Sequence, residues 1–594
     1  MRSFAAGGTR LAVLGHAPGT AAGSPDAAPD RVDGAPRNQA AAGEGPAAQT
    51  VRRCLARVRD TGDLADVDQV AALMRGSCHV AVTAHGRYRL QGTASGLRRV
   101  FWARWRGIAV AADRADILAR LTGAALDERY LALALLVPGP PAPADDLTPW
   151  RGVEAVPPGS ALTVSASGPP GVRRWWQPPP ADVSLVTGAQ FLREALREAV
   201  AERVGREDAA GRRVGCDLSG GLDSTSLAFL ARDRGPVPVT LTVTYEDTAN
   251  DDPYWAAIAR EHLHPQQGRA PDEAVALDIA GASLPGQYTG LEARATADAA
   301  APLLRGRADL EFLAATYLRH GASVQLAGHG GDEVLQAPPG YLHGLVRRRP
   351  LTALRHLRGH RARRRWLQGA ALHALADTRS YPQWLAGEAA RLKNTEPARG
   401  PFGWGEPLAL APWATPAARD LAADTLHEAA RTAAPLVPDR GQHATLHRVH
   451  TAARLYRHLR QEHPQPWIAL PFLDDRVLDS CLAVRLEERG TPFAYKPLLK
   501  AGLRGILPEE FHSRATKGAG TATVYQALRE QRAKLSALAD HSVLAERGLI
   551  DPVGLRQALS APGPRTDVHL ENTLACEHWL RSTTTPGPAF LERP

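Results

Sequence analysis

The stretch that decides the fold is Val214–Ser226, with the sequence VGCDLSGGLDSTS. It joins a predicted strand, Arg213–Leu218, to a predicted helix that begins at Ser224 and ends near Arg232. Two adjacent glycines allow positive φ and let backbone N–H groups approach oxyanions closely. The positive end of the helix that follows also attracts phosphate. The stretch therefore predicts a nucleotide-phosphate loop rather than an ordinary strand-to-helix turn.

The side chains of this loop suit the same purpose. Ser219 and Ser224 offer hydroxyl donors, and Asp223 offers the hard carboxylate oxygens that Mg²⁺ prefers. No Gly-Lys-Ser/Thr follows the glycines, so the loop is not a Walker A motif. Transfer of the γ-phosphate is therefore not the expected chemistry.

Strands alternate with helices on both sides of the loop. Further strands are predicted at Val237–Tyr245 and Ser323–Ala327. Helices are predicted at 189–203, 253–263 and 308–319, and residues 340–590 are mainly helical in pattern. This order predicts an α/β fold with a doubly wound parallel sheet and helical additions.

The N-terminal part has a different pattern, of short alternating segments separated by turns. Antiparallel strands are predicted at Cys78–Ala84, Arg87–Gly92, Val100–Trp105 and Gly107–Ala112. Proline-rich residues 177–180 are typical of a stiff linker. We predict one domain at 1–180, partly flexible over 1–50 because its centre is of low complexity, and a second at 189–594.

Composition excludes several classes of protein. The 594 residues are 44% hydrophobic and 22% charged, which excludes a mainly disordered chain. No apolar run reaches the roughly 18 residues that span a bilayer, and the first residues lack a secretory signal, so a cytoplasmic protein is expected. Five scattered cysteines without CxxC spacing argue against a disulfide framework or a zinc ribbon. The net charge of +9 is mild for this length and indicates a solvated basic surface.

Four motif regions follow one another between about 190 and 520. They are SGGLDS at 219–224, GHGGDE at 328–333, PFLD at 471–474, and YKPLLK at 495–500 with LPEE at 507–510. In this order they resemble the asparagine-synthetase-like branch of the N-type ATP pyrophosphatases. The first domain resembles that family's glutamine amidotransferase domain, an Ntn-type β-sandwich, more weakly and in degenerate form. Its signals are the Val156–Gly159 turn and the tryptophans at 175 and 176.

The resemblance implies a reaction in which ATP activates a carboxylate as an acyl-adenylate, pyrophosphate leaves, and an amine attacks. It implies ATP and Mg²⁺ as cofactors, with Asp223 and Asp332 as metal ligands and Lys496 as the group that stabilises the developing charge. The implied nucleotide-binding residues are Leu218, Ser219, Gly220, Gly221, Leu222, Asp223, Ser224, Val243 and Gly328. Only five of the 71 basic residues are lysines, so a lysine at 496 agrees with a special role.

Two positions depart from the family pattern. His329 stands where many relatives carry Glu or Asp, and it is either a base for the attacking amine or a neutral packing or hydrogen-bonding replacement. Glutamine-dependent relatives have a cysteine directly after the initiator methionine, whereas this chain begins Met-Arg-Ser-Phe and has no cysteine before Cys54. We therefore expect no glutamine hydrolysis and an amine supplied by the substrate.

Among relatives without the glutaminase cysteine, the chain is most similar to lasso peptide cyclases. These join a peptide's N-terminal amine to an Asp or Glu side chain as a macrolactam. The implied partners are a precursor or core peptide and, from the same pathway, a leader peptidase and a leader-binding protein. A β-lactam synthetase or an ammonia-dependent asparagine synthetase-like amide ligase is the alternative.

The remaining alternatives have weaker support. Lone cysteines argue against a tRNA-modifying pyrophosphatase, so no nucleic-acid partner is expected. The basic segment Leu345–Trp366 is either a peptide-binding surface or a solvated face. Five histidines between 443 and 463 precede PFLD on a predicted helix, with His443 and His447 one turn apart. No carboxylate stands with them as in a zinc site, so contact with the substrate is the preferred interpretation.

Overall fold

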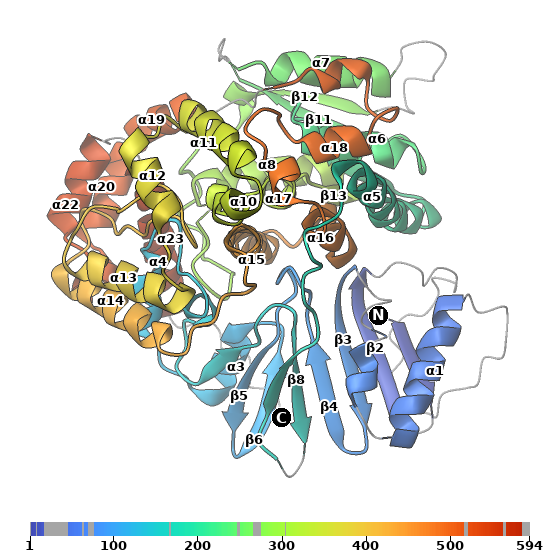
Figure 1. Cartoon of the computed structure of the whole chain (residues 1–594), viewed down its shortest axis with the longest axis horizontal. Coiled ribbons are helices and arrows are strands. Elements are labelled where there is room, and N and C mark those ends of the chain that lie inside the picture. The colour runs from blue at the N-terminus through green and yellow to red at the C-terminus, as the bar shows by residue number, and fades with distance from the viewer. Residues whose placement is uncertain are drawn as a thin grey trace.

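The computed structural model describes most of the chain (Figure 1). The described residues are 2–6, 9–16, 46–61, 64–68, 70, 76–165, 168–245, 250–264, 275–302, 304–515, 521–561 and 566–584. Most of the low-complexity segment expected to be flexible, residues 17–45, lies outside these ranges. Among the described residues, none of the helices combines the length and the apolar character that crossing a bilayer requires.

A five-stranded parallel sheet forms the centre of the C-terminal part, in the order β12-β11-β10-β13-β14. The strands are β10 (Arg213–Asp217), β11 (Val239–Thr244), β12 (Ala276–Ala280), β13 (Ala322–Leu326) and β14 (Trp467–Ala469). The chain runs outward from β10 to β12 and then returns to the opposite side of β10 with β13. The carboxyl ends of β10 and β13 therefore form the switch point where ligands bind in such sheets.

Helices cover both faces of this sheet because successive side chains of a strand point to opposite sides. Val214 and Cys216 of β10 pack with α5 (Leu185–Ala209) and α6 (Leu222–Arg232). On the other face, Tyr317 of α8 (Arg307–Arg319) packs with β11 and covers Gly215, where a Cβ would lie 2.5 Å from the tyrosine ring. α7 (Asp252–Leu263) joins β11 to β12. The predicted α/β class and parallel sheet are confirmed.

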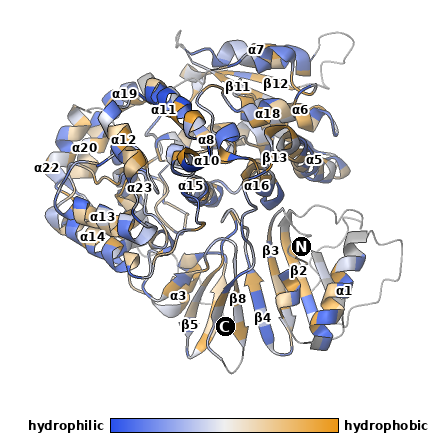
Figure 2. Cartoon of the chain, viewed as in Figure 1, coloured by the Kyte–Doolittle hydropathy of each residue, from blue (hydrophilic) through white to orange (hydrophobic). Residues whose placement is uncertain are grey.

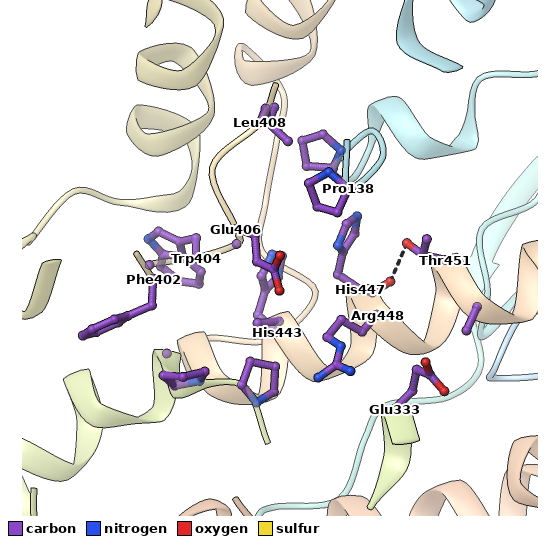
Figure 3. A pocket seen from close by; sticks show the side chains of 18 of the residues that line it. Pro138, Glu333, Phe402, Trp404, Glu406, Leu408, His443, His447, Arg448 and Thr451 are labelled. Atoms are coloured by element: carbon purple, nitrogen blue, oxygen red, sulfur yellow. Dashed lines mark hydrogen bonds between the residues drawn. The ribbon is translucent and has the colours of Figure 1, made fainter. Parts of the chain in front are cut away.

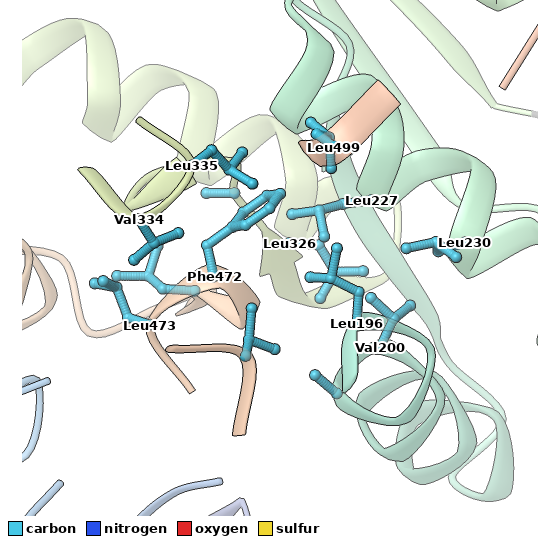
Figure 4. Packing of buried hydrophobic residues seen from close by; sticks show 14 of the residues in the cluster. Leu196, Val200, Leu227, Leu230, Leu326, Val334, Leu335, Phe472, Leu473 and Leu499 are labelled. Atoms are coloured by element: carbon cyan, nitrogen blue, oxygen red, sulfur yellow. The ribbon is translucent and has the colours of Figure 1, made fainter. Parts of the chain in front are cut away.

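One hydrophobic cluster fixes the motifs to the sheet (Figure 4). Phe472 and Leu473 of PFLD are fully buried against helices α5 and α6, and Leu499 joins them from the lysine segment. Asp474 accepts two hydrogen bonds of 2.8 Å from the buried Arg203 guanidinium of α5. PFLD thus anchors the loops around the switch point.

The remaining C-terminal helices pack beside the sheet. They are α9 (Gly331–Val334), α10 (Leu342–Arg348), α11 (Pro350–Arg364), α12 (Gln368–Ala376), α13 (Tyr381–Lys393), α14 (Pro416–Ala430), α15 (Arg440–Glu462), α16 (Asp475–Leu482), α17 (Leu486–Arg489), α18 (Pro497–Gly502), α19 (Thr521–Glu530), α20 (Arg532–Asp540), α21 (Val543–Glu546), α22 (Pro552–Ser560) and α23 (Thr566–Thr584). The basic segment Leu345–Trp366 contains parts of two helices, because Pro350 begins a new one at its N1 position.

Two antiparallel sheets form the N-terminal part. The six-stranded sheet has the order β1-β2-β3-β4-β8-β9, and the three-stranded sheet has the order β6-β5-β7. Their strands are β1 (Arg2–Ala6), β2 (Thr9–His16), β3 (Ser77–Ala84), β4 (Arg87–Gln91), β5 (Phe101–Trp105), β6 (Ile108–Ala112), β7 (Val153–Ala155), β8 (Ser160–Ser165) and β9 (Gly171–Arg174). Helices α1 (Pro46–Thr61), α3 (Ala115–Thr122) and α4 (Glu128–Ala134) accompany them. Leu90 and Leu162 of the larger sheet pack with Trp102 of the smaller one, so the two sheets share a core.

The four predicted antiparallel strands are confirmed, and β1 and β2 add two more within the segment expected to be partly flexible. Hydrogen bonds hold this part against the C-terminal helices: Asp475 of α16 accepts one of 2.8 Å from the Ala94 backbone N–H, and Asp479 accepts one of 2.9 Å from the Trp176 indole. The predicted amidotransferase-like character of these sheets stays a prediction.

Candidate functional site

The phosphate loop lies at the carboxyl end of β10, as the sequence predicts. Gly220 has a φ of +77°, and a Cβ there would lie 2.2 Å from the Asp252 carbonyl oxygen, so only glycine fits. The Ser219 and Ser224 hydroxyls are 2.8 Å apart, and the Gly221 backbone N–H donates to Ser219. α6 begins at Leu222, two residues earlier than predicted, because Gly221 serves as its N-cap. Asp223 and Ser224 are therefore in its first turn.

The second loop follows β13 and packs directly on the first. A Cβ on Gly328 would lie 2.6 Å from the Ser224 backbone nitrogen, and one on Gly331 would lie 2.5 Å from Asp223 Cγ. Glycine at both positions lets the two backbones approach, and this brings Asp332 to the same edge of the sheet as Asp223. Gly328 and Gly331 are therefore required for packing between the two loops, whereas a Cβ on Gly330 would meet Leu473 of PFLD.

Lys496 joins the two loops. Its side chain is buried, its Nζ lies 2.7 Å from Asp332 Oδ1, and it donates a hydrogen bond to Asp223. Burial disfavours the ammonium, but the charges of Asp223 and Asp332 outweigh that penalty and raise the pKa of Lys496 above its usual value. Lys496 has a φ of +47° and is the N-cap of α18, so it precedes the helix rather than lying within it.

A buried arginine that no sequence pattern indicated, Arg514, holds the phosphate loop in place. Arg514 donates hydrogen bonds to the Gly220 carbonyl and to Asp252, and its guanidinium lies 5.4 Å from the Trp255 ring centroid. Lys500 in turn donates to the Arg514 carbonyl at 2.5 Å. No motif marks Arg514, because only the fold brings it to Gly220.

His329 lies on the exposed side of the second loop. Its ring stacks on Tyr456 of α15, with centroids 4.5 Å apart and an interplanar angle of 17°. Burial, with Glu333, Asp332 and Asp223 nearby, raises the pKa of the Tyr456 phenol. The stacking shows a packing contact for His329 and leaves its catalytic role as a prediction.

A cavity of about 290 Å³ opens beside the second loop (Figure 3). Glu333 and Tyr456 line the end nearest the loop, and burial raises the pKa of the Glu333 carboxyl. Arg448 of α15 and Arg364 of α11 also line the cavity. Its other walls are largely apolar and aromatic, formed by Pro138, Trp384, Phe402, Trp404 and Leu408. This cavity, absent from the sequence analysis, thus offers groups of both charges on an apolar background.

A second cavity of about 340 Å³ adjoins the first. Pro138, Thr451 and Leu455 line both cavities. Together they extend along α15.

The sequence matches the asparagine synthase family over residues 191–581, which is more than half of the chain. The chain belongs to the asparagine synthase family. The match supports an ATP-dependent amide ligase with an ATP site.

Other comparisons add little to this membership of the asparagine synthase family. No curated protein matches the chain. A solved structure, the glutamine phosphoribosylpyrophosphate (PRPP) amidotransferase from B. subtilis complexed with ADP and GMP, is similar at 10% sequence identity and a TM-score of 0.17. The match covers 55% of this chain and 64% of that one, less than two thirds of its length. A TM-score this low does not establish a common fold.

The donor set suits the magnesium ion that the resemblance to this family implies. Asp223 and Asp332 both contact the Lys496 ammonium, so their carboxylates lie close together, and Mg²⁺ is commonly bound by one or two carboxylates together with substrate phosphates. In the described part of the chain, no three His, Cys, Asp or Glu side chains gather into a complete metal cluster. The two aspartates fit a metal that arrives with a nucleotide.

Most of the predicted nucleotide residues lie at the switch point of this asparagine synthase fold. Leu218 is buried at the end of β10, where its N–H donates to the Leu241 carbonyl at 2.8 Å. Val243 is half-buried near the carboxyl end of the neighbouring strand, β11. The structure thus brings Ser219, Asp223 and the second loop together, and Val243 lies one strand away.

Two of the five histidines between 443 and 463 line the first cavity, and all the cysteines are buried. His443 and His447 line the cavity, as expected for substrate contact, while burial lowers the pKa of His443 to about 3. All five cysteines are buried. Burial raises the pKa of Cys54, which is a poor nucleophile in α1.

Proposed function

We propose that the chain is an ATP-dependent lasso peptide cyclase. In this reaction an Asp or Glu side-chain carboxylate of a core peptide attacks the α-phosphorus of ATP, the bond to the β-phosphate oxygen breaks, and pyrophosphate leaves. The peptide's N-terminal amine then attacks the acyl carbon, and AMP leaves with the adenylate oxygen. The products are the macrolactam, AMP, pyrophosphate and the proton released by the amine.

The observation that carries this proposal is the position of Lys496 between Asp223 and Asp332, at the edge of the sheet and beside a cavity. In this proposal the phosphates bind at the start of α6, where backbone N–H groups can donate hydrogen bonds to them as at other helix N-termini. Asp223 and Asp332 would hold Mg²⁺, which supplies charge neutralisation for the leaving pyrophosphate when bound. Lys496 is a preorganised cation for the charge that develops on the adenylate.

The cavity favours a peptide over a single amino acid as substrate. Sites of roughly 300–1,000 Å³ hold drug-sized ligands, and the two adjoining cavities measure about 290 and 340 Å³. Arg364 and Arg448 suit a carboxylate, and Glu333 suits an ammonium, so one molecule carrying both groups fits the walls. His329, at the edge of the second loop, is the candidate base for that ammonium.

The proposed partners follow from this reaction. They are a core peptide as substrate and, in the same pathway, a leader peptidase and a leader-binding protein. The enzyme acts in the cytoplasm in this proposal.

The test is incubation of the protein with ATP, Mg²⁺ and the core peptide. We expect a peptide product lighter by one water, resistant to N-terminal labelling, together with AMP and pyrophosphate. A linear amidated peptide formed only when ammonia is added would instead indicate the ammonia-dependent ligase.

A further inference from the structure

Helices α10, α11 and α12 form a surface of unusual composition. Residues 342–376 contain nine arginines and neither aspartate nor glutamate. Many arginines elsewhere in the described chain pair closely with acids, as Arg391 does with Glu388 at 2.7 Å. Within the described residues, the only ion pair of these nine arginines joins Arg349 to Glu487 at 3.9 Å.

The stability of α11 does not explain these charges. Arg355, Arg358 and Arg361 follow at intervals of three residues, so they are neighbours on the helix surface and repel one another. Arginines in the last turn interact favourably with the helix dipole, but that effect does not reach Arg355 and Arg358. The unpaired charges therefore carry a cost to folding.

Apolar side chains are exposed among the arginines. Leu351 is 84% exposed, Leu367 is 79% exposed and Phe493 is 52% exposed. Phe493 lies against α11, with the Arg355 guanidinium 4.8 Å from its ring centroid. Figure 2 shows hydrophilic and hydrophobic residues mixed along α11 and α12. Interfaces between proteins combine arginine with aromatic and apolar groups in this way.

The surface is continuous with the cavity and with the lysine segment. Arg364, at the end of α11, lines the cavity, and Trp366 stacks on Phe402 of the cavity wall at 5.3 Å. In the other direction, Phe493 precedes Lys496 by three residues. A chain that leaves the cavity past Arg364 therefore meets α11.

We propose that α10–α12 bind an acidic, leucine-containing segment of the substrate polypeptide outside the cavity. The identity of that polypeptide as substrate rests on the proposed function. Unpaired arginines select carboxylates, and the exposed leucines and Phe493 give apolar contacts that a phosphate backbone does not use. Continuity with the cavity favours the substrate polypeptide over a lipid surface.

The test measures binding without ATP, by fluorescence anisotropy of a labelled peptide of alternating glutamate and leucine blocks. We expect binding that weakens as salt rises, because exposed charges are screened. The double variant Arg355→Glu/Arg358→Glu should bind about tenfold more weakly, and Arg355→Gln/Arg358→Gln should bind with intermediate affinity.

The matched control is Arg104→Glu/Arg174→Glu, which makes the same charge change at exposed arginines of β5 and β9. It should bind as the unchanged protein does. Equal weakening by both double variants would overturn the proposal, as would tighter binding of a duplex RNA or of phosphatidylglycerol vesicles.

A second measurement separates this proposal from the proposed function. If the acidic segment helps the enzyme to bind its substrate, a core peptide fused to this segment should have a lower KM than the core peptide alone. This difference should be seen with the unchanged protein but not with Arg355→Glu/Arg358→Glu, and kcat should be the same in both proteins. If the acidic peptide binds but no peptide is cyclised, the proposed function is refuted and the proposed binding surface is retained. If the peptide is cyclised with the same KM whether or not the segment is fused to it, the proposed binding surface is refuted and the proposed function is retained.

Discussion

The ammonium of Lys496 lies 2.7 Å from Asp332 Oδ1, although one residue caps α18 and the other lies in α9, the helix that follows β13. Asp223, in the first turn of α6, accepts a hydrogen bond from the same ammonium. Three segments of the chain thus meet at one cation. Each can be changed separately.

Replacing Lys496 by alanine should lower kcat by about 10²–10³-fold, because the site loses a preorganised charge at the developing adenylate. Exchange of labelled pyrophosphate into ATP with peptide present measures this step, and circular dichroism checks the fold. Lys393→Ala is the matched control, since Lys393 is a surface lysine paired with Asp424 at 2.9 Å. Exchange at the original rate in Lys496→Ala would remove the role assigned to it.

Gly331→Ala should also lower kcat, by about 10²-fold, because its Cβ would lie 2.5 Å from Asp223 Cγ and move the carboxylate. Gly205→Ala is the control: nothing lies within 4 Å of a Cβ there, near the C-terminal end of α5. That change should stabilise the protein by about 0.5–1 kcal/mol without affecting turnover. Full activity in Gly331→Ala would show that the close approach of the loops is not needed.

His329→Phe separates packing from proton transfer. Phenylalanine keeps a ring against Tyr456 but has no basic nitrogen. If His329 takes the proton of the amine, ring closure should fall by about 10²–10⁴-fold while pyrophosphate exchange continues. Ring closure at the normal rate in this variant would assign His329 to packing alone.

Buried histidines should make the protein sensitive to mild acid. Burial, with His447 nearby, lowers the pKa of His443 to about 3, so from pH 6.5 downward the unfolded chain binds a proton that the folded chain does not. Between pH 7 and pH 5 this histidine should cost about 2 kcal/mol of unfolding free energy. In urea unfolding, His443→Gln should lose less stability over this range, whereas His373→Gln, at an exposed position, should follow the unchanged protein. Equal losses of stability in the unchanged protein, His443→Gln and His373→Gln would contradict the assignment of this pH dependence to His443.

The sequence predicted the parts of the fold that have a clear pattern. β10, β11 and β13 carry buried apolar residues between loops, and the motif order placed Asp223 and Asp332 on adjacent strand ends. It missed β14, whose three residues lie within a helical region and pair with β13 alone, and β12, a short edge strand whose residues are exposed or half-buried.

For the site, local motifs predicted the loops but not what surrounds them. Arg514 has no motif and is one of many arginines, and it reaches Gly220 only through the fold. The cavity joins Pro138, Glu333, Arg364 and Arg448 from separate elements, so no spacing in the sequence could indicate it.

The most direct test of the central claim follows the oxygen atoms of the substrate carboxylate. The Asp or Glu side chain of the core peptide is labelled with oxygen-18, and the nucleotide products are examined by mass spectrometry. Adenylation predicts one heavy oxygen in AMP and none in pyrophosphate. Heavy oxygen in inorganic phosphate, with ADP as the nucleotide product, would contradict the account.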